Sequence, residues 1–342
     1  MVEEAQTEVM MNRLIPLMLL IWLLPGCSNH SFEVIKKFPV ENSIGPVKTI
    51  EYDVVNYPIW EIAEIGDFYL LSLFSDTGFG FAVTDKSFNQ ISRLCRLGNG
   101  PGEFLSTEFR GLISVSEDTL KFYVHDLLKG RRCIAAVCLK SGKSKITETD
   151  SFAPWTRAYY PLGNGKYLIS NNNNRYYLTD NSGNKTYFEG WGDDINEAVE
   201  NQEWYIPDIQ STETFNSDSS RLLINDRNSP ALWVHSTDGT LVKNVYIGKG
   251  PEDLDRDTYR GGHLGASYLG DDSIVTMYVE SDDMGETDSS WLLIFDKDLN
   301  PKARLSLQGE NKGFTLNRKT GILLMLGYDY EEIRVYDLSE WL

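Results

Sequence analysis

Residue types that support catalysis are sparse in this chain. The 342 residues include only four histidines: His30, His125, His235 and His263. The sequence contains neither the HExxH zinc motif nor the GxSxG nucleophile elbow. These patterns place a metal-activated water or an activated serine in common hydrolases. The sequence therefore offers no ready set of catalytic residues.

One acidic segment has part of the pattern of a calcium loop. Residues 253–257 read DLDRD, with carboxylates at the alternate positions that begin an EF-hand loop. Thr258 stands where that loop needs Gly, and Leu264 stands where it needs a bidentate Glu. We therefore expect an ordinary solvated acidic loop, with calcium as the alternative and no other cofactor.

The four cysteines give no metal motif. After Cys27, the remaining Cys95, Cys133 and Cys138 are an odd number and cannot all pair within the chain. None lies in a CxxC motif or at a zinc-ligand spacing from a histidine. We expect them to be small buried residues on strands. A Cys133–Cys138 disulfide is the alternative.

The charge balance excludes one class of partner. There are 50 acidic and 32 basic residues, which gives a formal net charge of −18. No block of lysines and arginines interrupts this balance. A protein that follows the phosphates of a nucleic acid needs such a block, so we expect no nucleic-acid partner.

The N-terminus has the features of an export signal. Residues 14–24 form an apolar run of eleven (LIPLMLLIWLL) that follows Arg13. Eleven residues are too few to span a bilayer but fit the core of a signal peptide, and a buried apolar helix is the alternative. The run ends at Leu-Pro-Gly followed by Cys27, which resembles the lipobox of bacterial lipoproteins. This resemblance implies that Cys27 is the lipidated residue.

The lipobox resemblance also implies an organisation and a location. Residues 1–26 are then the signal peptide, residues 27–45 a tether without sustained periodicity, and residues 46–342 the folded domain. Several acyl chains on Cys27 would hold the protein firmly in the outer membrane. Residues 28–33 (SNHSFE) lack an acidic cluster for surface export. We therefore expect the protein to face the periplasm.

A repeated pattern predicts the fold of the mature chain. A polar turn followed by a short apolar strand recurs six times, at intervals of 47 to 54 residues. A second apolar strand follows each of these, and in four repeats it ends on an aspartate: Asp85, Asp180, Asp296 and Asp337. With an inner strand before each turn and an outer strand at the end, each repeat contains four strands. Six such units predict an all-β, six-bladed β-propeller.

The two ends of the chain predict how the ring closes. The sixth repeat ends at Leu342 after its third strand. Residues 47–54 (VKTIEYDV) form an additional strand pattern before the first repeat. We expect this N-terminal strand to complete the last blade and to cover an edge that would otherwise aggregate. The expected product is a monomer.

A short motif resembles a known family. Residues 98–104 (GNGPGEF) resemble the GxGPGEF signature of six-bladed propeller lipoproteins of gut-type Gram-negative anaerobes, which are often grouped with TolB-like and NHL-like propellers. The matching residues are Gly98, Gly100, Pro101, Gly102, Glu103 and Phe104. A partial second copy, 150 residues later, keeps Gly248, Gly250 and Pro251 but has Glu252 at the third glycine.

The motif is interpreted as structural. Its glycines permit a tight turn between an outer strand and the next inner strand, and Phe104 is expected to fill a space between blades. A phosphate-binding role is the alternative, although no GK[ST] follows the glycines and Pro101 has no donor N–H.

Ligand-binding candidates come from the inner strands, which converge at the centre of a propeller. These candidates are Glu61, Arg110, Arg157, Tyr159, Asp208 and His263. Arg110 and Arg157 are the expected anchors for an anionic ligand, since guanidinium groups match carboxylates. The alternative is that all six are satisfied polar residues around a water-filled channel.

Two functions remain open. The first is a non-catalytic binding or scaffold protein that recognises a protein, peptide or glycan. The second is a metal-dependent hydrolase like the six-bladed lactonases, in which Glu61 and Asp208 would be metal ligands.

Overall fold

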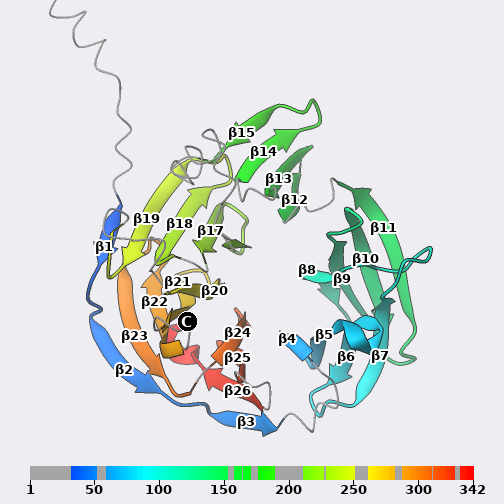
Figure 1. Ribbon diagram of the computed structural model, residues 1–342, viewed down its shortest axis with the longest axis horizontal. Helices are drawn as coiled ribbons and strands as arrows, with labels where there is room; N and C mark the ends of the chain where they lie inside the picture. Colours follow the sequence, from blue (N-terminus) through cyan, green and yellow to red (C-terminus); the bar gives the residue numbers. More distant parts are fainter. Residues whose placement is uncertain are drawn as a thin grey trace, which may run out of the picture. The chain divides into compact units, whose positions relative to one another are not determined.

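The structure is a computed structural model. It describes residues 32–51, 59–152, 158–163, 165–170, 176–188, 211–226, 229–250, 261–281, 287–309, 311–327 and 332–342. Residues 32–342 form one compact unit in which six small sheets are arranged as a ring (Figure 1). The predicted six-bladed β-propeller is confirmed.

Each blade has a core of four antiparallel strands. In five blades these strands are consecutive in the sequence, whereas in blade 6 the fourth strand is the N-terminal one. Blade 1 contains β4 (Ile59–Ile65), β5 (Phe68–Leu73), β6 (Phe79–Asp85) and β7 (Gln90–Arg96). Blade 2 contains β8 (Glu108–Val115), β9 (Thr119–Asp126), β10 (Arg131–Cys138) and β11 (Ser144–Ser151). Blade 3 contains β12 (Ala158–Gly163), β13 (Lys166–Ser170), β14 (Tyr176–Asp180) and β15 (Lys185–Tyr187).

The second half of the ring repeats this plan. Blade 4 contains β16 (Ser211–Phe215), β17 (Arg221–Asp226), β18 (Ala231–Ser236) and β19 (Leu241–Ile247). Blade 5 contains β20 (Gly261–Leu269), β21 (Ser273–Ser281), β22 (Thr287–Asp296) and β23 (Pro301–Leu307). Blade 6 contains β24 (Asn311–Leu316), β25 (Ile322–Gly327), β26 (Glu332–Asp337) and β3 (Lys48–Glu51).

The N-terminal strand β3 closes the ring, as predicted. It pairs antiparallel with β26, where Ile50 lies opposite Ile333. The backbone N–H of Val47 also donates to the carbonyl of Val335 over 2.8 Å. Ile50 and Ile333 are both buried in the apolar cluster between blades 6 and 1. The first and last segments of the domain therefore stabilise each other.

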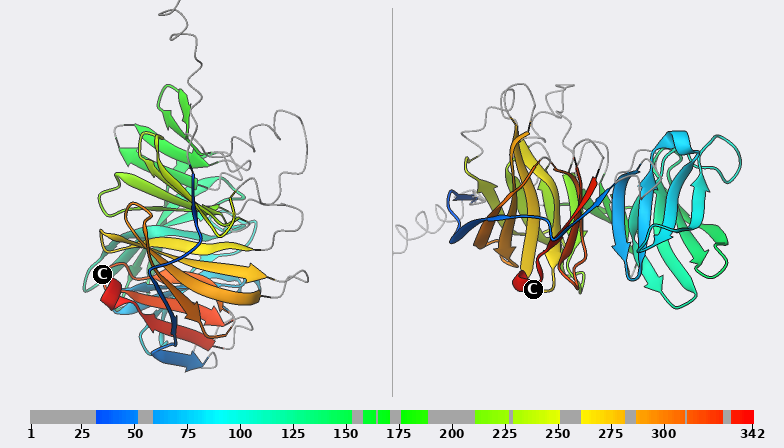
Figure 2. Two further views of the ribbon diagram at one scale, coloured as in Figure 1. Left: turned by 90° about the vertical axis from the view of Figure 1, so that its left-hand side faces the viewer. Right: turned by 90° about the horizontal axis from the view of Figure 1, so that it is seen from below.

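The segment before β3 corrects the prediction of a free tether. Residues of this segment form β1 (Glu33–Ile35) and β2 (Val40–Ile44), which pair in parallel with the outer strands β19 and β23. Ile35 and Phe38 are buried against blades 4 and 5. Figure 2 (left) shows this segment in dark blue as it crosses the outside of the yellow and orange blades. Residues 33–44 therefore belong to the folded domain.

The turn after the third strand explains why that strand so often ends on aspartate. In blade 1, Asp85 Oδ1 accepts the backbone N–H groups of Ser87 and Asn89, and Asp85 Oδ2 accepts the Asn89 side-chain amide over 2.8 Å. The same arrangement joins Asp180 to Asn184 and Asp296 to Asn300. These local bonds define the tight turn into the outer strand.

The structure also excludes the predicted alternative disulfide. Cys133 and Cys138 lie five residues apart on the extended strand β10. Their Cα atoms are therefore about 16 Å apart at the usual strand rise, whereas a disulfide needs less than 7 Å. Cys95 and Cys133 are buried in the cluster between blades 1 and 2, as expected of small apolar residues.

Candidate functional site

The inner strands of four blades bring a group of polar side chains together at the centre of the ring. β4, β8, β12 and β16 are the innermost strands of blades 1 to 4 (Figure 1). We call the following residues the axial cluster: Glu61, Glu108, Arg110, Tyr160, Tyr176 and Glu213. All except Tyr176, at the start of β14, lie on inner strands.

Arg110 connects three blades. Its Nη1 donates to Glu213 Oε1 of blade 4 over 3.1 Å and lies 3.5 Å from the Tyr160 hydroxyl of blade 3. Its Nη2 forms an ion pair with Glu108 on the same strand. Glu108 and Arg110 can pair because alternate residues of a strand project to the same side.

Glu213 is the acceptor at the centre of the cluster. Its side chain is only 4% exposed. The Tyr160 hydroxyl donates to Oε1 over 2.9 Å, and the Tyr176 hydroxyl donates to Oε2 over 2.8 Å. Together with Arg110, these groups satisfy a buried carboxylate that would otherwise be costly.

Glu61 extends the cluster to blade 1. The Ser72 hydroxyl on the neighbouring strand β5 donates to Glu61 Oε2 over 3.2 Å. Burial raises the pKa of Glu61, the Ser72 hydrogen bond lowers it, the Glu108 carboxylate raises it and Arg110 lowers it. The net direction of the pKa shift is upward, because burial outweighs the other effects and favours the neutral carboxyl group.

The contacts of Arg110 bear on the prediction that it anchors an anion. Burial by itself lowers the pKa of Arg110, but the Glu108 carboxylate, Tyr160 and Glu213 raise it above its usual value. The guanidinium is therefore already neutralised by two carboxylates. The Glu108 and Glu213 carboxylates outnumber the guanidinium, so the cluster offers an anionic ligand little electrostatic attraction.

The other predicted ligand residues are not part of this cluster. His263 is completely buried inside blade 5, where its Nδ1 lies 2.8 Å from the Thr276 hydroxyl and its ring lies beside Tyr278. Burial lowers the pKa of His263 to about 3, so the ring is neutral. This placement does not fit a ligand-binding role. Arg157 and Asp208 lie outside the described residues, as does the side chain of Tyr159.

The sequence analysis missed Glu108, Tyr160, Tyr176 and Glu213. One signal was available, because Glu108 lies two residues before Arg110 and shares its side of the strand. Tyr160 is adjacent to the predicted Tyr159 on β12. Nothing in the local sequence of β16 indicates that Glu213 meets Arg110, since 103 residues separate them.

The GNGPGEF motif has a structural role in the described contacts. It forms the connection from β7 to β8, in which Glu103 Oε2 accepts the backbone N–H of Gly100 over 2.8 Å. A Cβ atom on Gly98 would lie 2.2 Å from Glu103 Oε2, and Gly102 has φ +78°. Both positions therefore require glycine. Phe104 is completely buried between blades 1 and 2, as expected.

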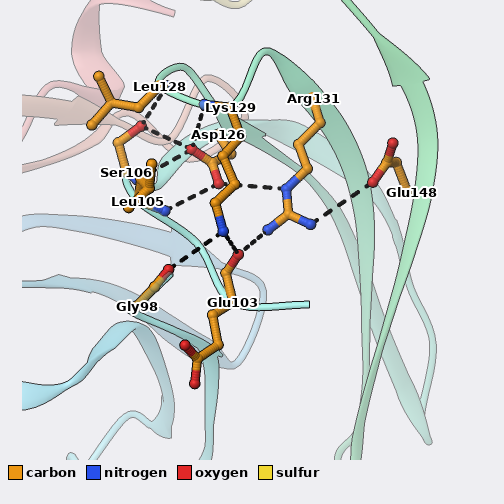
Figure 3. Close-up of polar contacts among 9 residues, drawn as sticks. All are labelled: Gly98, Glu103, Leu105, Ser106, Asp126, Leu128, Lys129, Arg131 and Glu148. Carbon is orange, nitrogen blue, oxygen red and sulfur yellow. Dashed lines mark hydrogen bonds and ion pairs between the residues drawn. The ribbon is translucent and has the colours of Figure 1, made fainter. Parts of the chain in front are cut away.

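Side chains of blade 2 form hydrogen bonds with this motif loop (Figure 3). Lys129 Nζ donates to the Glu103 carbonyl over 2.6 Å, and Arg131 also donates to this carbonyl. The buried Asp126 carboxylate accepts the backbone N–H groups of Leu105 and Ser106 over 3.1 and 3.2 Å. The carbonyl of Glu103 and the N–H groups of Leu105 and Ser106 are therefore already hydrogen-bonded within the protein.

The second copy of the motif and the acidic loop are only partly described. Gly248 is exposed with φ +77°, and Gly250 is buried. Pro251 and residues 253–260 lie outside the described residues. Within the described part of the chain, no group of three or more His, Cys, Asp and Glu side chains is arranged to hold a metal ion.

Comparison with known proteins supports the fold. No family model matches the chain, and no curated protein matches its sequence. A member of the DUF4221 family from Bacteroides vulgatus has a similar structure, with a TM-score of 0.51, 9% sequence identity, and coverage of 85% of this chain and 96% of that protein. At this identity the likeness establishes the fold alone.

Two further solved structures have lower similarity. The β-propeller domain of Cps50 (Swd1) from Myceliophteria thermophila has a TM-score of 0.41 at 10% identity and covers 85% of this chain and 99% of that one. A putative exported protein from Bacteroides fragilis has a TM-score of 0.45 at 11% identity and covers 86% of this chain and 88% of that one. The described residues contain no helix that is both long and apolar enough to span a membrane.

Proposed function

We propose that the protein is a non-catalytic binding propeller, anchored in the outer membrane through Cys27 and facing the periplasm. Its axial cluster recognises a positively charged group, such as a lysine or arginine side chain of a partner protein or peptide. The acidic character of this cluster carries the proposal, because the carboxylates of Glu108 and Glu213 outnumber the Arg110 guanidinium with which both of them pair.

The accessible part of the cluster fits this role. The Glu108 side chain is 32% exposed, whereas Arg110 is 18% and Glu213 is 4% exposed. An incoming cation would therefore meet Glu108 first. A charge-assisted hydrogen bond to this carboxylate would be stronger than a neutral one. The ion pairs of Arg110 with Glu108 and Glu213 would fix the position of the Glu108 carboxylate.

The same geometry favours binding over metal-dependent hydrolysis. In the lactonase-like alternative, Glu61 would be a metal ligand. In the structure, Glu61 accepts a hydrogen bond from Ser72 and lies in the field of Arg110. Arg110 already engages Glu108 and Glu213, so these two carboxylates are less available to complete a metal site beside Glu61.

Calorimetric titration of the full-length protein with two peptides tests the proposal. The peptides share one length and differ only in having lysines or glutamates. We expect binding of the lysine peptide to weaken at least tenfold in Glu108→Gln. The control variant Glu117→Gln removes the same charge from an exposed position near the opposite end of β8 and should bind normally. Preferential binding of the glutamate peptide, or equal effects of the two variants, would refute an acidic recognition site.

A further inference from the structure

One interface of the ring differs from the other five. Clusters of buried apolar side chains join blade 1 to 2, blade 3 to 4, blade 4 to 5, blade 5 to 6 and blade 6 to 1. No corresponding apolar cluster joins blade 2 to blade 3 in the part of the chain that is described. We call the facing surfaces of these two blades the seam.

The seam face of blade 2 is identified by strand alternation. Leu120, Phe122 and Val124 of β9 are completely buried against blade 1. The alternate residues of β9 therefore project to the opposite face, toward blade 3. They include the exposed Lys121 and the half-buried Tyr123, with the half-buried Ile134 opposite Tyr123 on β10.

The seam face of blade 3 follows in the same way. Leu168 and Leu178 are buried against blade 4, so the alternate residues of β13 and β14 face blade 2. Among them, Tyr167 and Ile169 are half-buried. Tyr187 on β15 lies opposite Tyr177 and is 50% exposed. Apolar and aromatic surface therefore remains accessible on both sides of the seam.

The seam is also basic, in contrast to the rest of this acidic protein. By register, its charged side chains on the described strands are Glu108, Lys121, Arg132, Lys145, Asp150 and Lys185. This face therefore carries four cations and two carboxylates, whereas the whole chain has a net charge of −18. Such a local reversal attracts anions to one place on the surface.

Cations and aromatic rings are paired on both sides of the seam. The Arg132 guanidinium lies 3.7 Å from the centre of the Tyr123 ring, and Lys185 Nζ lies 4.7 Å from that of Tyr177. Arg132 also lies near the Asp150 carboxylate, with an N–O distance of 3.6 Å. These contacts place a cation over one face of the Tyr123 and Tyr177 rings, and the half-exposed Tyr187 offers a ring to a ligand with flat apolar faces.

The inner end of the seam is polar. Arg110 reaches from blade 2 past Tyr160 of blade 3 to Glu213 of blade 4. His125 lies opposite Glu108 and Arg132 on the neighbouring strands and is completely buried: burial and the charges of Arg110 and Arg132 lower its pKa to about 2. Its ring is therefore neutral, and the positive charge of the seam comes from lysine and arginine, which persists at physiological pH.

We propose that the seam between blades 2 and 3 binds an acidic polysaccharide. The uronate or sulfate groups would pair with Lys121, Lys145 and Lys185. The C–H faces of the sugar rings would pack on tyrosine rings, whose π faces carry partial negative charge. The three lysines are not part of the axial cluster, so this proposal does not depend on the function proposed for that cluster.

The observations favour this ligand over other polyanions. A nucleic acid has a higher charge density and would be repelled by the strongly acidic remainder of the protein. An acidic peptide would use the lysines but would supply no ring faces for the tyrosines. An acidic polysaccharide uses both features of the seam.

Titration of the full-length protein with four polymers tests the proposal. The probes are polygalacturonate, neutral dextran, polyglutamate of matched charge, and single-stranded DNA. We expect polygalacturonate to bind most tightly, with an affinity that decreases as salt is added. Equal or tighter binding of polyglutamate or DNA would refute the proposal, because charge alone would then explain the interaction. Equal binding of dextran would refute the role of the lysines.

Two pairs of variants locate the site. We expect Lys121→Gln with Lys185→Gln to weaken polygalacturonate binding at least tenfold, and Tyr187→Ala to weaken it severalfold. Lys37→Gln with Lys319→Gln removes the same charge from exposed positions elsewhere and should change the affinity less than twofold. All four lysines are exposed, so a melting curve should confirm that each variant remains folded. Equal loss in both lysine pairs would overturn the assignment to the seam.

Discussion

Arg110 in blade 2 and Glu213 in blade 4 form a 3.1 Å ion pair that passes the inner strand of blade 3. The pair therefore connects blades that are not neighbours in the ring. It lies beside the interface that has no apolar cluster among the described residues. The axial cluster thus has a structural role in addition to the proposed binding role.

This relationship predicts the effect of removing the Glu213 charge. Glu213→Gln cannot satisfy two tyrosine hydroxyls and the guanidinium at once, and it leaves Arg110 with one carboxylate fewer. We expect a loss of about 3 kcal/mol in the free energy of unfolding, measured by chemical denaturation. Glu117→Gln, which removes an exposed charge, should change stability by less than about 0.5 kcal/mol. Equal stability of the two variants would show that the cluster does not hold the blades together.

Because β3 closes the ring, its removal should destabilise the whole domain and not only the N-terminal segment. Deletion of residues 47–51 leaves the third strand of blade 6 with an open edge and removes the buried Ile50. We expect a large decrease in the melting temperature of the whole domain. The milder Ile50→Ala should cost about 2–4 kcal/mol through the cavity that it leaves. An unchanged melting curve for the deletion would contradict closure at this strand.

The closing strand was predictable because the sixth repeat contains only three strand patterns and one further strand pattern precedes the first repeat. Strands β1 and β2 were not predictable in the same way. β2 reads VENSI and is mostly exposed, because backbone hydrogen bonds to β23 hold it and its side chains need no apolar alternation. A sequence pattern reports side-chain burial, so a strand added at an outer edge leaves little signal.

The residues of the candidate site were also predictable only in part. Arg110 and Glu61 were predicted because polar residues stand out on apolar inner strands. Their charge environment was not predictable, since Glu213 comes from a blade 103 residues away. For His263, the position on an inner strand does not reveal which way the ring points. The structure places that ring against Thr276 inside the blade.

The glycine motif predicts a specific steric coupling. In Gly98→Ala the new methyl group would lie 2.2 Å from Glu103 Oε2. We expect a destabilisation of about 2 kcal/mol, from this clash and from the unfavourable backbone conformation. Adding Glu103→Ala should recover part of the loss, which a double-mutant cycle in urea measures. Strict additivity of the two changes would rule out the contact.

The hairpin turn of blade 4 predicts a pH dependence. Hydrogen bonds from Ser236 and Thr240 lower the pKa of Asp238 from 3.8 to about 2. Because the folded-state pKa is below the unfolded value, the stabilisation is complete above pH 3.8 and is lost as the pH falls to about 2. Asp238→Asn should remove this contribution, so its stability relative to the parent protein should be lowest above pH 4. A difference that is constant from pH 2 to pH 6 would contradict the prediction.

The lipobox pattern predicts a chemical modification at one residue. Cys27 follows the apolar run of residues 14–24 at the spacing expected of a lipoprotein signal. Cys27→Ala removes the thiol that would carry the lipid, so we expect the variant to lose its fatty acids and to be released or retained as the uncleaved precursor. Mass spectrometry of the N-terminal peptide from membrane and soluble fractions measures both outcomes. Cys138→Ala is the matched control, because it removes a thiol that is not buried and should leave acylation unchanged. A fatty-acylated product from the Cys27→Ala variant would refute anchoring through this residue.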